Sequence, residues 1–366
     1  MKRYFILFIL AVFPLTIAVA QADLQPVAIV NLTRSEPITV KQLKAEIERI
    51  AWQSITARLG RIPTTAELNK EVQNCSMETK RQVLDVLINN RLAIQAAERD
   101  KITVTDNEVN QQINQLKAQM AKAKGRQPTD EEFATAIKNE FGLDLPALRD
   151  TIKRQGIVQK YLLSKKQDLF TNIKQPTNEE IVSFYNLNKA RFVRPDTVRF
   201  SMIQVPYGGQ DAAAKNKAKE LGDRLVRDIG SDPSKFDEAV MRGQSPNSGY
   251  QAGDGGYVPR NAEAQQVLGA NFMNAAFSLR QGEVSRLIEG VGGYQIIKVT
   301  ETLPQKALEL DEITEPGSRV TIRQFIAEGL LEQRQQEIQE RASNELITEL
   351  RAKDTTFRIM ENNLNW

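Results

Sequence analysis

The segment FVRPDTVRFSMIQV, at residues 192–205, marks the point where the sequence changes from a helical to a strand pattern. Polar and apolar side chains alternate with period two along its second half, and this alternation predicts a half-buried β-strand. Its two faces carry Val198, Phe200, Met202 and Gln204 on one side, and Arg199, Ser201, Ile203 and Val205 on the other.

Downstream of this strand, helical patterns are separated by glycine-rich connections. A glycine-rich stretch over residues 248–257 contains Gly253-Asp254-Gly255-Gly256, but no Gly-Lys-Ser/Thr follows, so we interpret it as a turn and not as a phosphate-binding loop. This order of elements predicts an α+β region with a compact mixed sheet and helices on one face. The expected elements are a helix over 212–229, a shorter helix from Phe236, a helical piece over 272–279 and a last strand over 294–299.

The chain upstream of the strand pattern is predicted to be helical to about Phe170, with Thr39 capping its first helix. Helix starts are indicated by capping boxes, in which a Thr hydroxyl satisfies an orphan amide and a Glu three residues later reaches back. The adjacent acids Glu131-Glu132 and Glu179-Glu180 occupy first turns, so we interpret them as capping charges and not as acid–base pairs. The capping boxes are Thr64/Glu67, Thr105/Glu108, Thr129/Glu132 and Thr177/Glu180.

The two ends of the chain are expected to build one domain. Residues 27–32 predict a short strand, residues 320–353 a long helix, and residues 357–360 a closing strand that pairs with the first. A coiled coil or a membrane-surface helix fits the long helix less well, because its charges balance and its apolar stripe lacks strict heptads. The expected division is 1–22 signal peptide, 23–174 N-terminal helical domain, 175–303 inserted domain, and 304–366 a helix and strand packing on the N-terminal domain.

The N-terminus has the pattern of a secretory signal peptide. Lys2 and Arg3 precede an uncharged, mostly apolar run over residues 4–20 that ends in small residues, so we expect cleavage near Ala22. A retained membrane anchor is the alternative, but Pro14 and Thr16 interrupt the run and it is short for a membrane span.

The composition excludes several classes of function. The sequence has 0 His, which removes His-based triads and zinc sites, and we expect no metal ion or other cofactor. Its one cysteine, Cys75, cannot form an internal disulfide. Lys plus Arg total 49 and Asp plus Glu 46, so no basic stripe for nucleic acid is indicated.

Several motifs between about Arg194 and Thr300 resemble the parvulin domain of the SurA/PrsA-like periplasmic foldases. The resemblance begins with the approach Pro176-Thr177-Asn178-Glu179-Glu180-Ile181. The later motifs are Ser245-Pro246-Asn247-Ser248, Gly253-Asp254-Gly255-Gly256-Tyr257, Phe272 with Ala275-Ala276-Phe277-Ser278-Leu279, Gly282-Glu283-Val284-Ser285, and Gly292-Gly293-Tyr294-Gln295-Ile296-Ile297-Lys298-Val299. The flanking helical segments resemble the SurA-type chaperone domain more loosely.

The resemblance implies a site in which the catalytic positions are degenerate. The family's two histidines fall on Met202 and Gln295, and its loop Asp or Cys falls on Ser245, so the polar network of the family is absent. Both Met202 and Gln295 could equally be core positions of a sheet. The implied substrate-binding positions are Leu268, Phe272, Gly255, Tyr257 and Tyr294, with Gly255 standing where the family often has Leu.

The resemblance therefore implies a helical SurA-type chaperone domain with one inserted parvulin-like α+β domain. We expect a periplasmic chaperone of the SurA/PrsA type that binds unfolded or partly folded exported polypeptides, such as outer-membrane proteins, with transient proximity to a membrane. A peptidyl-prolyl isomerase of low efficiency is one alternative, since twisting an amide needs no proton transfer. A structural adaptor with a degenerate domain is the other.

Overall fold

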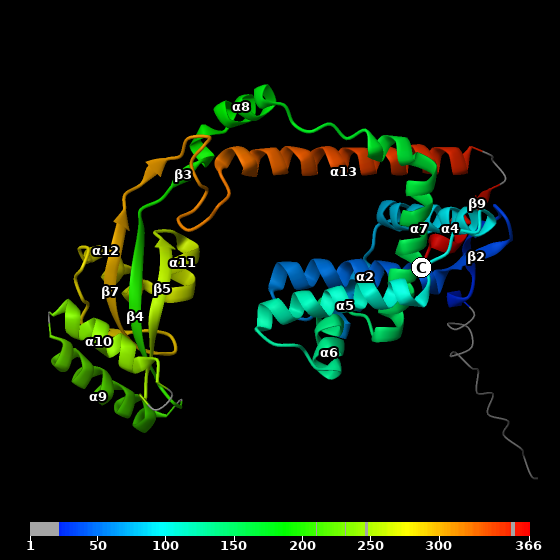
Figure 1. The fold of residues 1–366 in the computed structure, drawn as a ribbon. Helices are drawn as coiled ribbons and strands as arrows, with labels where there is room; N and C mark the ends of the chain where they lie inside the picture. The colour runs from blue at the N-terminus through cyan, green and yellow to red at the C-terminus, as the bar shows by residue number, and fades with distance from the viewer. Residues whose placement is uncertain (1–21, 210, 231, 246–247, 353–355) are drawn as a thin grey trace, which may run out of the picture. The chain divides into compact units, whose positions relative to one another are not determined.

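The computed structural model describes residues 22–209, 211–230, 232–245, 248–352 and 356–366. The expected signal peptide, apart from Ala22, lies outside these residues. The chain divides into two compact units (Figure 1): a helical unit formed by Met1–Ile173 with Arg334–Trp366, and a sheet unit formed by Lys174–Gln333. The sheet unit extends further than the inserted segment we expected, because residues 304–333 belong to it.

Capping boxes begin the helices of the helical unit at the positions that the sequence indicated. Thr64, Thr105 and Thr129 each accept a hydrogen bond from the amide of the Glu three residues later, and that Glu side chain accepts one in return. The box at Thr177 starts the first helix of the sheet unit in the same way. The elements of the helical unit are β1 (Pro26–Val30), β2 (Glu36–Thr39), α2 (Val40–Leu59), α3 (Thr65–Gln73), α4 (Met77–Arg99), α5 (Asp106–Lys124), α6 (Asp130–Phe141), α7 (Leu145–Thr171), β9 (Phe357–Ile359) and the 3-10 helix η2 (Glu361–Leu364).

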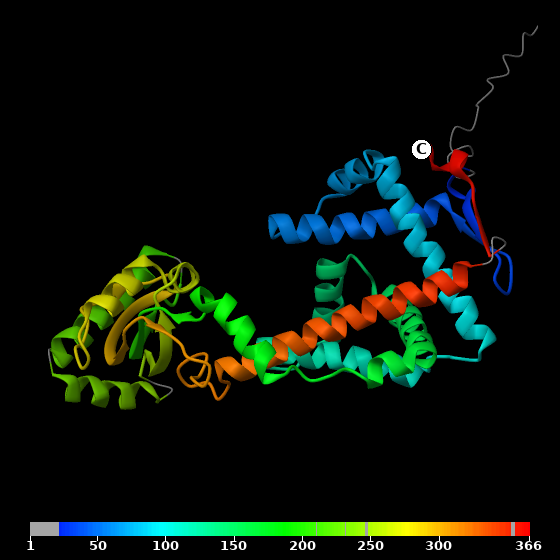
Figure 2. The same cartoon turned by 90° about the horizontal axis from the view of Figure 1, so that it is seen from above.

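Both ends of the described chain meet in one small sheet with strand order β2-β1-β9. Strand β9 pairs antiparallel with β1, with Ala28 opposite Ile359 and Val30 opposite Phe357, which confirms the predicted pairing of the first and last strands. Figure 2 shows this red C-terminal segment beside the blue N-terminal strands. The core beneath the sheet includes Val27, Val30, Leu84, Ile88, Leu92, Tyr161, Ala342, Leu346 and Leu350.

The sheet unit is built around a four-stranded sheet of order β5-β4-β7-β6, in which every pairing is antiparallel. Its long strands are seen side by side in Figure 1. Its elements are α8 (Asn178–Leu187), the 3-10 helix η1 (Lys189–Arg191), β3 (Val193–Arg194), β4 (Thr197–Pro206), α9 (Ala212–Ile229), α10 (Pro233–Gly243), β5 (Gln251–Pro259), α11 (Ala262–Leu268), α12 (Ala270–Ser278), β6 (Ile288–Glu289), β7 (Gly293–Leu303) and β8 (Lys306–Ala307).

Helices cover both faces of this sheet, so our expectation of a mixed sheet with helices on one face was wrong. The reason is that β4 carries apolar side chains on both faces. Ile203 and Val205 pack with α9 and α10 in one core. Val198 and Phe200 pack with α12 in a second core on the opposite face.

The glycine-rich stretch 253–256 is part of strand β5 and is not the turn that we expected. The register with β4 shifts between Phe200/Gly256 and Ser201/Asp254, which leaves Gly255 as an extra, bulged residue. Gly256 has φ +75°, a conformation that favours glycine. Glycines here therefore bend an edge strand instead of ending it.

The long C-terminal helix α13 (Ile322–Arg351) was predicted, but it contributes to both units. Ile322 and Ile326 pack against Ile181 and Tyr185 within the sheet unit, whereas Ala342 and later residues pack in the helical unit. The prediction that the long helix packs onto the N-terminal helices is therefore confirmed only for the C-terminal part of α13. No helix in the described part of the chain is long and apolar enough to cross a membrane.

Candidate functional site

Three of the predicted site residues meet on the sheet face that α12 covers. The helix begins after Gly269, whose φ of +87° allows a sharp entry, and it buries Phe272 and its neighbours against the sheet. Met202 from β4 and Leu268 from the end of α11 are half-buried and pack against the same cluster. The resemblance-based grouping of Met202, Leu268 and Phe272 is therefore present in the fold.

Phe272 does not line an open pocket, because its side chain is 0% exposed. Its ring meets the ring of Phe200 edge-on, with centroids 5.0 Å apart. Phe200 in turn fills the space beside Gly255, where an added Cβ would lie 2.2 Å from Phe200 Cε2. The expectation of a prolyl pocket at Phe272 is thus corrected: the volume is occupied by a side chain of the protein itself.

Phe200 is a site residue that the sequence reasoning missed. The available signal was the glycine at 255, where the resembling family often has Leu, together with a large aromatic residue on the neighbouring strand. Alternation along β4 placed Phe200 on the correct face, but only the register with β5 shows that its ring takes the volume left by Gly255.

Gln295 is buried in the sheet at one of the two histidine positions of the resemblance. It lies on β7 directly opposite Gln204 of β4, and its side chain packs over Gly290. Its Oε1 is buried and accepts no hydrogen bond from any described residue. Neither Gln295 nor Met202 can transfer a proton near neutral pH, so the pair cannot carry out acid–base catalysis. Gln295 can form hydrogen bonds through its amide, and Met202 can make apolar contacts.

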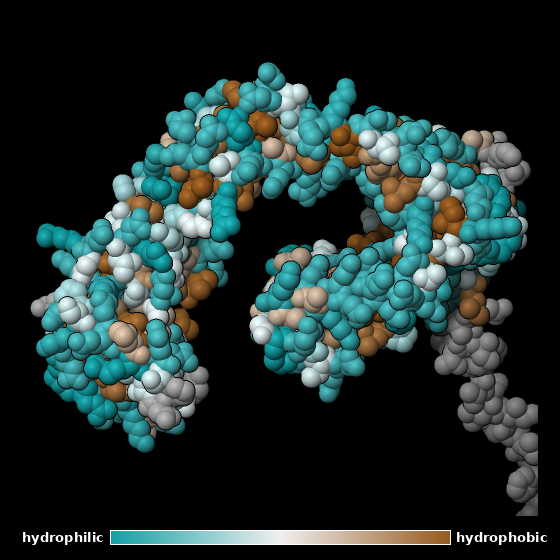
Figure 3. All heavy atoms as spheres, in the orientation of Figure 1, coloured by the Kyte–Doolittle hydropathy of each residue, from teal (hydrophilic) through white to brown (hydrophobic). Residues whose placement is uncertain are grey.

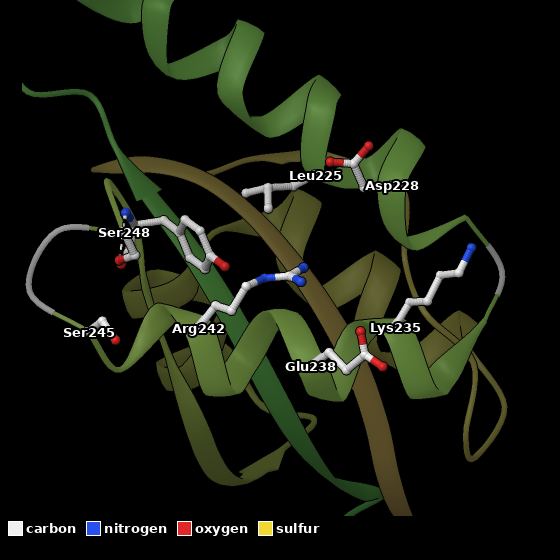
Figure 4. Close-up of a pocket in the computed structure, with 8 residues that line it drawn as sticks. Leu225, Asp228, Lys235, Glu238, Arg242, Ser245 and Ser248 are labelled. Atoms are coloured by element: carbon white, nitrogen blue, oxygen red, sulfur yellow. Dashed lines mark hydrogen bonds between the residues drawn. The ribbon is translucent and has the colours of Figure 1, made fainter.

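Ser245 lies beyond the C-terminal end of α10. It lines a pocket of about 630 Å³ between α9 and α10 (Figure 4). Arg242 and Glu238 project from α10 into this space, and Leu225 and Tyr250 form its apolar wall. The grouping of Ser245 with the two degenerate histidine positions stays a prediction.

Tyr257 and Tyr294 lie on the opposite face from Phe272, so they do not line the same site. The Tyr257 hydroxyl donates to Glu301 Oε2 at 2.7 Å, and this bond raises the pKa of Tyr257. Arg199 pairs with Asp254 beside it and lowers the pKa of that carboxyl. Tyr294 is buried in the core under α9 and α10, edge-on to Tyr207 at 5.4 Å.

The helical unit carries a second candidate surface, made of apolar side chains around Trp52. The indole of Trp52 lies over Gly142, the C-cap of α6, and its Nε1 donates to the carbonyl of Asn139 at 3.2 Å. Leu59 lies two turns further along the same stripe of α2, and Ile62 follows the helix. We call the half-buried and exposed side chains of Trp52, Leu59, Ile62, Phe141 and Leu143 the Trp52 patch.

The cluster behind this patch leaves much apolar surface accessible. Only three residues of the α5–α6–α7 cluster are fully buried, namely Phe133, Ile137 and Leu148. Figure 3 shows brown and tan side chains interspersed with teal ones over this region. The half-buried apolar residues around it are Ile113, Leu116, Met120, Phe141, Leu143, Leu145 and Ile152.

The described residues contain no group of three or more acidic or cysteine side chains placed to hold a metal ion.

Two family models match the chain. The SurA-like N-terminal domain matches residues 1–162, and the PPIC-type PPIASE domain matches residues 176–315.

Curated relatives and solved structures give similar matches. The foldase protein PrsA of Clostridium botulinum is 24% identical over 257 residues, which cover 68% of this chain and 67% of the relative. PrsA of Clostridium kluyveri is 29% identical over 245 residues, covering 66% of each chain, so these matches span about two thirds of the relatives. A SurA-like chaperone of Campylobacter jejuni aligns with 92% of this chain and 100% of its own at 14% identity and TM-score 0.36. PrsA of Bacillus subtilis aligns with 90% and 93% at 19% identity and TM-score 0.24.

Proposed function

Because this chain joins a SurA-like N-terminal domain to one PPIC-type rotamase domain and so belongs to the SurA/PrsA-like foldases, we propose that it holds unfolded exported polypeptides in the periplasm. Outer-membrane proteins are the proposed clients. The signal-like N-terminus supports export.

The observation that carries the proposal is the Trp52 patch with the half-buried cluster behind it. Apolar side chains that stay partly exposed on a folded unit offer a surface to the apolar segments of an unfolded chain. Met120 and Trp52 suit this role, because a flexible thioether and a large amphipathic ring accept differently shaped partners. Each contact buries little area, so a client is released as readily as it is bound.

The rotamase domain is proposed to contribute binding more than catalysis. Lowering the roughly 20 kcal/mol barrier of a prolyl amide requires a pocket that grips the ring and twists the bond. Phe200 and Phe272 fill that pocket, and no histidine is present in the sequence. Half-buried Met202 and Leu268 support weak isomerisation as the second candidate function.

Aggregation of a chemically unfolded test protein, followed by light scattering, tests the holding function. We expect the full chain to suppress scattering at equimolar or higher ratio. The variant Leu59→Gln/Ile62→Gln should suppress it several-fold less, since it makes the patch polar. Its matched control is Leu187→Gln/Val291→Gln in the sheet unit, where the two side chains are 84% and 81% exposed, and this variant should act as wild type.

Unchanged scattering with the wild-type chain would defeat the chaperone proposal and favour the adaptor role. A prolyl-peptide isomerisation assay addresses the second candidate. A rate gain that Leu268→Ala abolishes would show that the rotamase domain is catalytic despite its filled pocket.

A further inference from the structure

Three glutamines form a row across the central strands of the sheet unit. Gln204 of β4 lies opposite Gln251 of β5 on one side and opposite Gln295 of β7 on the other. Neighbouring strands are about 4.8 Å apart, so the three side chains are adjacent. The three strands run side by side in Figure 1.

This glutamine row faces the same side of the sheet as Met202 and Phe272. Residues two apart on a strand share a face, and Gln204 is two residues from Met202. Likewise Gln295 is two residues from Ile297, which packs in the cluster around Phe272. Exposure rises along the row, from buried Gln295 through half-buried Gln204 to exposed Gln251, so it leads from the core to solvent.

The inner end of the row has an unused hydrogen-bonding group. Gln295 is 8% exposed, and its buried Oε1 has no donor among the described residues. A buried acceptor without a donor is unfavourable, and this amide is not held in place by such a bond. It can turn about its last side-chain torsion toward an incoming donor without losing a bond at Oε1.

Glutamine side chains have the hydrogen-bonding groups of a peptide bond, one carbonyl acceptor and an N–H donor pair. A row of them beside the apolar Met202 matches an extended polypeptide, whose backbone offers N–H and C=O groups at regular spacing. Nothing in the row selects a charge or a proline ring. We propose that the glutamine row binds the backbone of extended client segments regardless of their proline content, an inference that rests on the proposed chaperone function.

Backbone N-methylation of a peptide tests this directly, because it removes N–H donors and leaves the side chains unchanged. We would measure binding to the full chain by fluorescence anisotropy, using a labelled apolar peptide without proline and its N-methylated counterpart. N-methylation should weaken binding to the wild-type chain about five-fold, the factor for one hydrogen bond of ordinary net strength. A peptide of the same length whose single proline lies outside the N-methylated stretch should bind as the unmethylated one does, because it keeps the same N–H donors in that stretch.

The variant Gln204→Leu/Gln295→Leu should weaken binding of the unmethylated peptide by a similar factor and should no longer distinguish the two peptides. The matched control is Gln281→Leu, at an exposed position outside the row, which should keep the wild-type difference. If the double variant does not fold by circular dichroism, Gln251→Leu at the exposed end of the row replaces it.

The outcomes separate the two proposals. If the folded variant still discriminates against the N-methylated peptide, or if the proline peptide binds many-fold tighter, the glutamine row is not a backbone-binding site. The holding function would survive either result, since peptide still binds. If the wild-type chain binds none of the peptides, the holding function fails and the inference fails with it.

Discussion

Exchanging the side chains at positions 200 and 255 should show that Phe200 fills the volume left by Gly255. Phe200 is 3% exposed, so Phe200→Ala removes a buried ring and should destabilise the sheet unit by about 3–5 kcal/mol. Gly255→Leu alone should cost at least as much as ordinary overpacking, about 1–3 kcal/mol, because its Cβ would lie 2.2 Å from the Phe200 ring.

The double variant Phe200→Ala/Gly255→Leu should lose much less than the sum of the two single changes. The new leucine occupies the volume vacated by the ring, so we expect a coupling energy of about 2–3 kcal/mol in favour of the pair. Phe200→Ala alone leaves this volume beside Phe272 empty, so the single variant, and not the double one, should gain measurable prolyl isomerisation if the filled pocket is what limits catalysis.

Urea unfolding followed by two signals provides the assay. Both tryptophans, Trp52 and Trp366, lie in the helical unit, so their emission serves as an internal reference that the variants should leave unchanged. Tyrosine near-ultraviolet circular dichroism reports mainly on the sheet unit, which contains five of the seven tyrosines: Tyr185, Tyr207, Tyr250, Tyr257 and Tyr294. Additive losses in the double variant would refute the filling argument.

Three further predictions concern the helical unit. Trp52→Ala should destabilise the helical unit by about 2 kcal/mol and reduce aggregation suppression, because the α2–α6 contact and part of the Trp52 patch are lost. If this variant suppresses scattering as the wild type does, Trp52 does not take part in binding clients. Lys80 Nζ donates hydrogen bonds to the carbonyls of Leu364 at 3.0 Å and Trp366 at 2.8 Å. Lys80→Met should therefore lower the free energy of unfolding, measured in urea, by about 2 kcal/mol. An unchanged urea midpoint would refute this link to the C-terminal segment. Hydrogen bonds, chiefly from Arg126, lower the pKa of Glu132 from 4.5 to about 2, so its stabilising contribution is present above pH 4.5 and is lost as the pH falls toward 2. Glu132→Gln should therefore flatten the pH profile of the urea midpoint between these pH values. An unaltered profile would contradict the assigned contribution of Glu132.

Local sequence signals predicted the helical starts and the pairing of the chain ends well. A capping box involves residues three positions apart, so the box at Thr105 and Glu108 depends on nothing distant. The strand near each terminus was recognised from apolar and β-branched residues, and their pairing was predicted, but the adjacent strand β2 that pairs with the other edge of β1 was not. Conversely, the strand through Gly253 was missed, because glycine in a strand and glycine in a turn look alike until a neighbouring strand is known.

The site was predicted in part. The motifs identified the rotamase domain, and alternation along β4 placed Met202 on the face that also bears Phe272. Tyr257 and Tyr294 were assigned to that face wrongly, because motif membership says nothing about which side of a sheet a residue faces. Only register, which the sequence does not encode locally, resolves this.

By itself the sequence determined the family, the helical caps, the absence of histidine chemistry and the strand pattern at each end of the chain. Each of these depends on residue type or on spacing along the chain. The tertiary structure decided which side chains share a volume. A bulge at Gly255 lets the ring of Phe200 close the pocket, and cross-strand pairing brings Gln251, Gln204 and Gln295 together from positions far apart in sequence. Such packing is set by distances between strands, and those exist only once the chain has folded.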